Sequence, residues 1–319
     1  MSNIKISGNI LCMGSINMDL VMFIDRLPEP GETIVTDNFN KYPGGKGGNQ
    51  AVAASMLGGN VTLFGKLGDD DFSSQLRESL ISKGVEISSI ISEEGVTAGI
   101  AMIRVDKKGQ NSITFTPGAN AKLTPGDVRK HENLFTSGGI LLITMEIKPE
   151  TVYEAVRVAK KNGMFIILDP APVPKDNIHS DIPPLIDIIK PNEIEATSIT
   201  GIEVKDFSSS EKAIRKLLEM GFSHPIITLG EKGVIAYLEE KIIKIDSISV
   251  KVVDCTAAGD VFSGALAASI SRGERLSDAL KFANTAAALS VTVQGAQTSI
   301  PTLEKVIGFM KEKKNLIFF

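Results

Sequence analysis

The sequence predicts an α/β fold: a three-layer sandwich with a mostly parallel central sheet between helices, and a small β-sheet that projects from it as a lid. The first observation is that short apolar, β-branched runs alternate with segments of helical spacing along most of the 319 residues. This alternation is typical of βαβ units, whose parallel strands are covered on both faces. The second observation is that residues 19–42 and 97–117 interrupt it without helical periodicity. Because no long linker or internal repeat occurs, we expect a single domain over residues 1–319.

The main sheet is predicted from short apolar runs separated by helical patterns. The expected strands are Asn9–Ile16, Val61–Gly65, Ile140–Met145, Met164–Asp169, Ile186–Ile189 and Pro225–Leu229. The expected helices are Gly48–Leu57, Asp71–Lys83, Glu150–Asn162, Ser209–Met220, Ala258–Ser271, Ser277–Val293 and Thr302–Lys311. In the second of these helices, Phe72, Leu76 and Leu80 recur on one face, which is helical spacing.

The lid is predicted from two strand-like segments. Residues 19–42 alternate around the turn Pro28-Glu29-Pro30-Gly31, and Thr97–Pro117 has the pattern of a hairpin with strands at Ala101–Val105 and Ser112–Thr116. We expect one small sheet that covers a site. The alternative is an antiparallel extension of the main sheet's edge. Since the edges and apolar face of a small projecting sheet are commonly covered by a partner, we also expect a homodimer through the lid.

Composition and charge exclude several functional classes. With 43% hydrophobic and 23% charged residues, the chain resembles an ordinary globular protein. Its formal net charge of -4 argues against nucleic acid or an anionic membrane as a partner. Because no apolar run reaches the roughly 18 residues of a membrane helix and no leader pattern is present, we expect a cytoplasmic protein. Cys12 and Cys255 lie in apolar stretches, which predicts two buried thiols without a disulfide.

The segment from Val252 to Ala265 carries the predicted chemistry. An apolar strand is expected to end at Val253, followed by a tight turn of small residues and an alanine-rich helix that begins near Gly259. The free N–H groups and the dipole of a helix start favour a bound anion. Asp260 lies at that terminus, where the dipole is expected to keep it ionised and able to accept a proton from a hydroxyl group. The alternative is an ordinary acidic residue of a first helical turn.

A second group of polar residues suits a sugar. Asn17, Asp19 and Asn49 lie beside glycines at expected strand ends or helix starts, where open α/β sheets bind ligands. A carboxylate that accepts from adjacent hydroxyls, together with amides that donate and accept, fits a polyol. Each residue also has a local alternative: a turn residue for Asn17 and Asp19, and a helix cap for Asn49.

Nine short motifs, in order along residues 14–297, give the chain a family resemblance. They are Gly14-Ser15-Ile16-Asn17-Met18-Asp19, Pro30-Gly31-Glu32-Thr33, the stretch from Pro43 to Ala53, Gly118-Ala119-Asn120, Asp169-Pro170-Ala171-Pro172, Pro191-Asn192-Glu193, Thr228-Leu229-Gly230, Ala257-Ala258-Gly259-Asp260 with the upstream Asp254, and Gly295-Ala296-Gln297. Together they resemble the ribokinase-like, or PfkB, carbohydrate kinases. The resemblance implies an ATP-dependent sugar kinase in which Asp260 is the catalytic base and Ala257, Ala258 and Gly259 form an anion hole.

The resemblance also implies which residues line the sugar pocket: Asn17, Asp19, Gly45, Lys46, Gly47, Gly48, Asn49, Glu146 and Asp260. Glu146 directly follows an apolar strand, as expected for a side chain at the carboxyl edge of a sheet. Gly48 stands where many members have Ala, which we expect to make the loop more flexible. Because the glycines around Lys46 lack the spacing of a Walker A motif, ATP is not expected there, and a solvent-facing lysine is the alternative.

ATP and its ions are expected at the other end of the cleft. The resemblance places ATP across Asn192, Thr228, Gly230, Gly233, Gly259 and Asn284, of which Asn284 differs from the polar residue common at its position. Mg²⁺ is expected near Asn192 and Glu195, held by phosphates and water more than by the protein. A monovalent cation, K⁺, is implied beside the anion hole, at Asp254, Thr256, Ser290, Val293, Gly295 and Ser299.

The expected reaction is therefore transfer of the γ-phosphate of ATP to the 5-hydroxyl group of D-ribose, with Mg²⁺ and K⁺ as cofactors. The first alternatives keep this chemistry and change the acceptor to deoxyribose, a ketohexose or a nucleoside. A nucleoside needs a stacking surface for its base, which a chain with no Trp and three Tyr disfavours. The last alternative is a non-catalytic sugar or nucleotide sensor, which the intact Asp260 disfavours.

Overall fold

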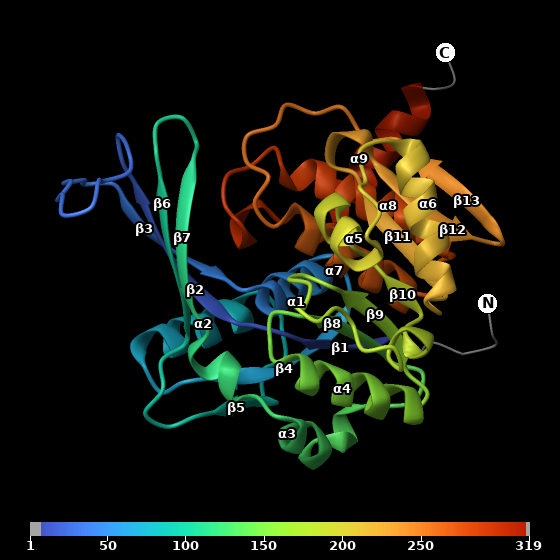
Figure 1. The fold of residues 1–319 in the computed structure, drawn as a ribbon, viewed down its shortest axis with the longest axis horizontal. Coiled ribbons are helices and arrows are strands. Elements are labelled where there is room, and N and C mark those ends of the chain that lie inside the picture. Colours follow the sequence, from blue (N-terminus) through green and yellow to red (C-terminus); the bar gives the residue numbers. More distant parts are fainter. Residues whose placement is uncertain (1–7, 317–319) are drawn as a thin grey trace.

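The structure, a computed structural model, describes residues 8–316 and has a large sheet between two layers of helices (Figure 1). The sheet order is β13-β12-β11-β10-β9-β8-β1-β4-β5. Its strands are β1 (Asn9–Met13), β4 (Asn60–Leu67), β5 (Ile90–Ser92), β8 (Ile140–Thr144), β9 (Phe165–Asp169), β10 (Ile188–Ile189), β11 (His224–Thr228), β12 (Val234–Leu238) and β13 (Lys241–Ile245). All neighbours pair in parallel except β11–β12 and β12–β13. The predicted α/β sandwich is thus confirmed.

The helices divide between the two faces of the sheet. They are α1 (Lys46–Met56), α2 (Asp71–Ser82), α3 (Pro125–Lys130), α4 (Pro149–Lys161), α5 (Glu193–Thr200), α6 (Phe207–Glu219), α7 (Ala258–Ser271), α8 (Leu276–Ser290) and α9 (Leu303–Leu316). Buried side chains of α1, α2, α7, α8 and α9 pack with one set of strand residues, and those of α3, α4, α5 and α6 with the other. In β1, Ile10 and Cys12 face the first layer while Leu11 and Met13 face the second, as the period of two in a strand requires.

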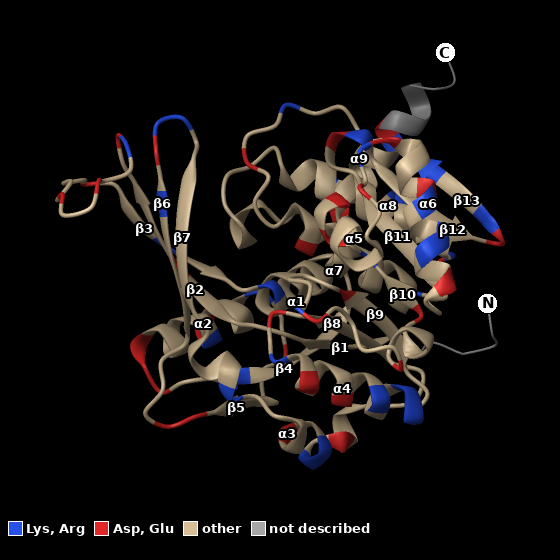
Figure 2. Cartoon of the chain, in the orientation of Figure 1, with Lys and Arg blue, Asp and Glu red and all other residues tan. Residues whose placement is uncertain are grey.

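The lid is a separate four-stranded sheet in the order β3-β2-β6-β7, so the alternative of an edge extension is wrong. Its strands are β2 (Asn17–Phe23), β3 (Phe39–Gly44), β6 (Gly99–Val105) and β7 (Asn111–Thr116). It begins two residues before the predicted boundary at 19 and projects from the left side of the molecule in Figure 1. Figure 2 shows that its strands carry few charged residues and that most charged residues of the lid lie in the loops at its tip.

Two predictions about strands need correction. The hairpin β12–β13 was not expected, because its turn residues Glu239 and Glu240 have positive φ angles of 49° and 61°, a conformation usually signalled by Asn or Gly. Conversely, the strand that was predicted to end at Val253 does not form. Val252 and Val253 lie in an irregular segment and are each 57% exposed, and the Val253 N–H donates to the Val291 carbonyl. Apolar β-branched residues form a strand only where a neighbouring strand is available to pair with them.

Candidate active site

The site forms where α1 begins against the end of β1. Gly14 follows β1, Gly47 lies in the first turn of α1, and their backbones touch: a Cβ atom on Gly47 would lie 2.5 Å from the Gly14 carbonyl carbon. The thiol of buried Cys12 donates to the Gly47 carbonyl at 3.4 Å. This packing brings Lys46 and Asn49 to the carboxyl edge of the main sheet, where ligands bind in open α/β folds.

Glu146 joins the two sides of the predicted sugar pocket. It follows β8, and its Oε2 accepts a hydrogen bond from the backbone N–H of Lys46 at 3.1 Å. The Ser15 hydroxyl donates to the same oxygen, and Asn17 Nδ2 lies 3.5 Å from it. Because these contacts all use Oε2, Oε1 has no hydrogen-bond partner within residues 8–316 and is available to a ligand.

Asn17 presents the donor end of its amide to the pocket. Its Oδ1 accepts a hydrogen bond from Nδ2 of buried Asn120 at 2.8 Å. Asn120 is fixed in turn, because its own Oδ1 accepts from the Ile16 N–H at 2.9 Å. Sequence reasoning quoted the motif that contains Asn120 but gave it no role, since nothing in the sequence indicates that it reaches a residue 103 positions away.

Asp19, on β2, lies close to Gly44 of β3, where an added Cβ atom would come within 2.4 Å of the carboxylate. Burial raises the pKa of Asp19 to about 7, and the negative charges of Glu146 and Asp260 add to the rise. This carboxyl group therefore exchanges a proton near neutral pH, and above that pH it is an acceptor for hydroxyl groups.

Asp260 lies buried in the first turn of α7 and is held by two amides of α1. Asn49 Nδ2 donates to its Oδ2 at 3.0 Å, and Gln50 Nε2 donates to its Oδ1 at 3.1 Å. Burial raises its pKa and the charge of Asp169 adds to this, although Lys46 and the two amides oppose it. The expectation that the helix dipole keeps Asp260 ionised stays a prediction, and burial, which the sequence does not show, shifts the pKa in the opposite direction. A raised pKa brings a general base closer to the working pH.

The turn before α7 leaves backbone donors unpaired. Ala257 has φ 60° and ψ 8°, the left-handed conformation, and no side chain caps the helix. Within residues 8–316 the N–H groups of Gly259 and Asp260 have no acceptor. Since a residue with a Cβ atom costs roughly 1–2 kcal/mol in this conformation, the turn is held by other contacts. Such a turn offers an anion the free N–H groups predicted from the sequence.

Lys46 does not face bulk solvent. Its pKa is raised by the charge of Asp260 above all, with contributions from Asp169 and Glu146, although burial opposes the rise. Its ammonium group makes no hydrogen bond or ion pair with any described residue. Gly48 also differs from expectation, because it lies inside α1 and is buried, so that it adds no flexible loop.

The predicted ATP residues meet around the ends of β10 and β11. Asn192 caps α5 and forms a bridge with Thr228, and the following turn places Gly230 and Gly233 at φ 54° and 91°. An added Cβ atom on Gly233 would lie 2.1 Å from the carbonyl of the last residue of β13. The side chain of Asn284, on α8, contacts the segment after β13: its Nδ2 donates to the Asp246 carbonyl at 3.0 Å. Its amide nitrogen thus holds a loop.

The donors present fit hydrated Mg²⁺ better than a caged metal. Glu195 shares a capping box with Asn192, and its carboxylate accepts from the Asn192 N–H at 2.9 Å. Burial, with the charge of Asp169, raises the pKa of Glu195, while the hydrogen bond from the Asn192 N–H and the charges of Lys190 and Lys46 oppose the rise. No three His, Cys, Asp or Glu residues of the described chain are grouped to hold a metal ion. One carboxylate and an amide suit an ion that keeps its waters.

The residues predicted to bind a monovalent cation are partly brought together. The Asp254 carboxylate accepts from the N–H and hydroxyl groups of Thr256 at 2.9 and 2.7 Å, and from the Gly295 N–H at 2.8 Å. Partial burial raises its pKa, but these hydrogen bonds outweigh it and lower the pKa overall. Ser290 ends α8 and its carbonyl accepts from the N–H of Val293 in the following turn, and Ser299 follows Gly295 in a short 3₁₀ helix. An ionised carboxylate is an oxygen ligand of the kind that hard cations prefer.

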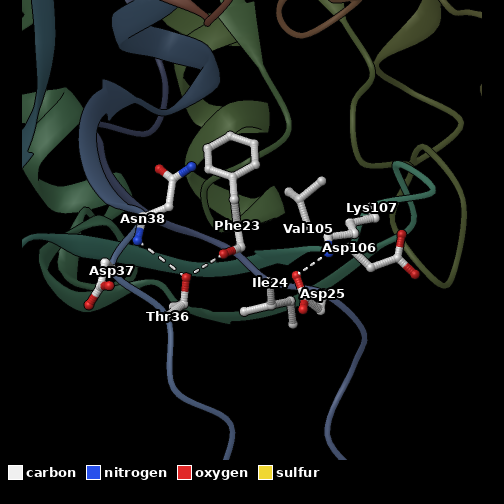
Figure 3. A pocket seen from close by; sticks show the side chains of 9 residues that line it. All are labelled: Phe23, Ile24, Asp25, Thr36, Asp37, Asn38, Val105, Asp106 and Lys107. Carbon is white, nitrogen blue, oxygen red and sulfur yellow. Dashed lines mark hydrogen bonds and ion pairs between the residues drawn. The ribbon is translucent and has the colours of Figure 1, made fainter.

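Other features lie outside the site. A hollow of about 570 Å³ at the far end of the lid is lined by Phe23, Ile24, Asp25, Thr36, Asp37, Asn38, Val105, Asp106 and Lys107 (Figure 3), none of which belongs to the predicted site. The two cysteines differ in burial. Cys12 is buried, but Cys255 is exposed because its segment forms no strand. The prediction of two buried thiols is therefore wrong for Cys255. No described helix has the length and apolar character needed to cross a membrane.

Comparisons with known proteins match the chain to one family along nearly its whole length. The model of a family described as pfkB family carbohydrate kinase matches residues 7–303. The chain is 37% identical over 299 residues to a ribokinase of Haemophilus influenzae, covering 94% of this chain and 97% of that protein. It is 32% identical to a deoxyribokinase of Salmonella typhi, covering 93% and 97%. The structure of Arabidopsis thaliana ribokinase complexed with ribose and ATP superposes with a TM-score of 0.87 at 32% identity, covering 96% of this chain and 99% of that one.

Proposed function

The chain belongs to the pfkB family of carbohydrate kinases, and from this membership we propose that it uses ATP to phosphorylate the 5-hydroxyl group of D-ribose. The relative solved with ribose and ATP supports this choice of substrates. The proposal includes the residues that perform the reaction, which we assign from the contacts described above.

The sugar is held by groups that the fold leaves free. Asp19 accepts from ring hydroxyls once it is ionised, Glu146 offers its Oε1, and Asn17 donates through Nδ2. Asp260 lies beside this set, with Asn49 fixing one of its oxygens. A hydroxyl that approaches the Asp260 carboxylate loses its proton to it as the oxygen attacks the γ-phosphate.

The charge that develops on the transferring phosphoryl group is met by backbone and side-chain donors. The unpaired N–H groups of Gly259 and Asp260 point out of the start of α7, and the ammonium of Lys46 has no other partner within residues 8–316. Mg²⁺, which Asn192 and Glu195 would help to hold through water, neutralises the phosphates when it is bound. We also propose that K⁺ binds at the Asp254 loop, where it would support the same turn.

One observation carries the proposal: a buried carboxylate fixed by two amides stands at a helix start whose N–H groups are free. The test is Asp260→Asn, assayed by coupled ADP release. We expect kcat to fall by a factor of about 10³ or more because the proton acceptor is lost, while sugar affinity changes little. A variant that keeps wild-type turnover would disprove the assignment of the base.

Deoxyribose is the second candidate acceptor, favoured by the similarity to a deoxyribokinase. The two sugars differ by one hydroxyl group, and a site that hydrogen-bonds this group discriminates by a large factor. Comparing kcat/KM for ribose, deoxyribose, a ketohexose and a nucleoside decides among the acceptors. Failure of every acceptor to be phosphorylated would favour a sensor.

We further propose that the protein is a homodimer that pairs through the lid. Ile113 and Phe115 on β7 are 55% and 42% exposed. The register places Phe115 opposite Ala101, and Ala101 beside Asp19, so Ile113 and Phe115 lie on the lid face that carries Asp19. A second lid would cover this face. The cytoplasmic location expected from the sequence stays a prediction.

A further inference from the structure

Asp260 is linked to a second buried acid, Asp169, at the end of β9. The link is Gln50, whose Nε2 lies 3.1 Å from Asp260 Oδ1 and 2.8 Å from Asp169 Oδ2. A side-chain amide carries two N–H donors, so one Gln50 nitrogen can serve both carboxylates at once. The three residues come from α1, β9 and α7, so the link joins three elements at one point.

Asp169 is itself paired with Lys190, which follows β10. The Lys190 ammonium lies 2.8 Å from Asp169 Oδ2, and the two side chains are 4% and 2% exposed. The same ammonium lies 3.3 Å from the carbonyl of Gly259, and the Ser263 hydroxyl is 3.1 Å from both that carbonyl and Asp169 Oδ2. The ion pair therefore contacts the backbone of the anion-hole turn as well as the amide that holds the base.

Stability does not account for this arrangement. A buried ion pair loses the solvation of both charges, and apolar replacements of such pairs are often neutral or stabilising. The main sheet already buries apolar residues on both of its faces. A charged pair at the carboxyl end of β9, one amide away from Asp260, thus indicates a role in the chemistry.

Resting on the kinase function proposed above, we propose that Gln50 and the buried Asp169–Lys190 pair are positioning residues, which hold the Asp260 carboxylate and the Gly259 peptide for phosphoryl transfer. Asp260 remains the catalytic residue. Gln50 fixes the direction of its Oδ1, and Lys190 orients the peptide whose N–H group belongs to Asp260. Such contacts keep the base within the small tolerance that proton transfer allows.

The same residues also affect the pKa of Asp260, and Asp169 and Gln50 shift it in opposite directions. The titratable and charged groups that face Asp260 are Lys46 from α1, Asp169 from β9, Asp19 from β2 and Cys12 from β1. The charge of Asp169 raises the pKa of Asp260, whereas the hydrogen bond from Gln50 lowers it. Removing the charge of Asp169 should therefore move the acid limb of the pH–activity profile to lower pH. Removing the amide of Gln50 should move it to higher pH.

The experiment measures the pH dependence of kcat at saturating sugar for three variants of the full chain, because kcat/KM would also report the protonation of Asp19. For Asp169→Asn, which keeps the shape and removes the charge, the acid limb should move to lower pH by about one unit. For Gln50→Met, which removes the bridge without changing any charge, it should move to higher pH. In both variants kcat should fall about 10- to 100-fold from misplacement of the base, with sugar affinity by calorimetry within about threefold of wild type.

The matched control is Lys66→Met. Lys66 is also buried and also paired, lying 2.9 Å from Glu93 and 3.2 Å from Asp127, but it has no contact with Asp260. It should lose stability in thermal unfolding while its acid limb stays where it is in the wild type. This control separates a general effect of breaking a buried ion pair from an effect on the base.

The outcomes are distinct. Limbs that move in opposite directions support the inference, and limbs that stay in place in folded variants overturn it. If Asp169→Asn does not fold, Gln50→Met decides alone, because its neutral side chain of similar length leaves the Asp169–Lys190 pair intact. A wild-type protein that phosphorylates no sugar would instead contradict the proposed function.

Discussion

Two neighbouring glycines of α1, Gly47 and Gly48, should respond in opposite ways to the same added methyl group. A Cβ atom on Gly47 would lie 2.5, 2.7 and 2.9 Å from backbone atoms of Gly14 and Ser15, which cannot move aside as a side chain can. On Gly48 its nearest neighbour would be Gln297 Nε2 at 3.6 Å, an ordinary contact. Neither residue has a positive φ angle, so space alone distinguishes them.

The magnitudes follow from these distances. Gly47→Ala forces the start of α1 away from β1, and overpacking of this kind costs about 1–3 kcal/mol in the free energy of unfolding. Gly48→Ala removes the backbone freedom of a glycine inside a helix, which should stabilise the protein by about 0.5–1 kcal/mol. The two variants should therefore differ by about 1.5–4 kcal/mol, although they differ only in the position of one methyl group.

The assay is urea-induced unfolding followed by circular dichroism, together with sugar binding by calorimetry. Gly47→Ala should also weaken sugar binding about tenfold or more, because Lys46 and Asn49 move with the helix start. Gly48→Ala should bind sugar as the wild type does. A Gly47→Ala variant as stable as the wild type, or a Gly48→Ala variant that loses more than about 1 kcal/mol, would refute the reasoning from backbone contact.

Three further predictions concern the sugar site, the cation site and the lid. Sugar affinity should rise about tenfold between pH 6 and pH 8, because a sugar hydroxyl binds the ionised form of Asp19, whose pKa is about 7. Calorimetry should find this pH dependence in the wild type and a weak, pH-independent affinity in Asp19→Asn. A wild-type affinity that does not change with pH would contradict the prediction. Wild-type activity should rise with K⁺ at fixed ionic strength. Asp254→Ala should not respond to K⁺, because it removes the carboxylate that accepts hydrogen bonds from both Thr256 and Gly295. A wild-type activity that does not change with K⁺ would contradict the cation site. Phe115→Asp should sediment as a monomer at concentrations where the wild type is a dimer, since a charge on the exposed apolar face opposes pairing; a monomeric wild type would contradict the proposed dimer.

The fold was predictable because its signals are local. The alternation of apolar strands and helical segments needs only neighbouring residues, and α7 begins at Ala258, as its composition indicates. Elements failed where the local signal was absent or misleading. The turn Glu239-Glu240 lacks the residues that usually mark its geometry, and the valines before Asp254 have strand propensity but no strand to pair with.

The site was predictable to a different extent. Motifs placed Asn17, Asp19, Glu146 and Asp260 near one another, and their mutual contacts in the structure agree. The residues that orient them were missed, because Gln50 is separated from Asp260 by 210 positions and an internal glutamine of a helix carries no signal of such a contact. The rise in the pKa of Asp260 was also missed, since burial is a property of the whole fold and cannot be judged from a helix terminus.

The connections between the lid and the main domain have a mechanical consequence. Four chain segments join the two parts, and two of them lie at the sugar pocket: the short path from the end of β1 to Asn17, and Gly45 alone, at φ 83°, between β3 and α1. One of these segments leads into Asn17 and the other is Gly45, and both residues are assigned to the sugar pocket, so we expect a displacement of the lid to change the surface that the substrate touches. Insertions should be tolerated at the tip, between β2 and β3, whereas even one residue added beside Gly45 should disturb both the position of the lid and the binding of the sugar.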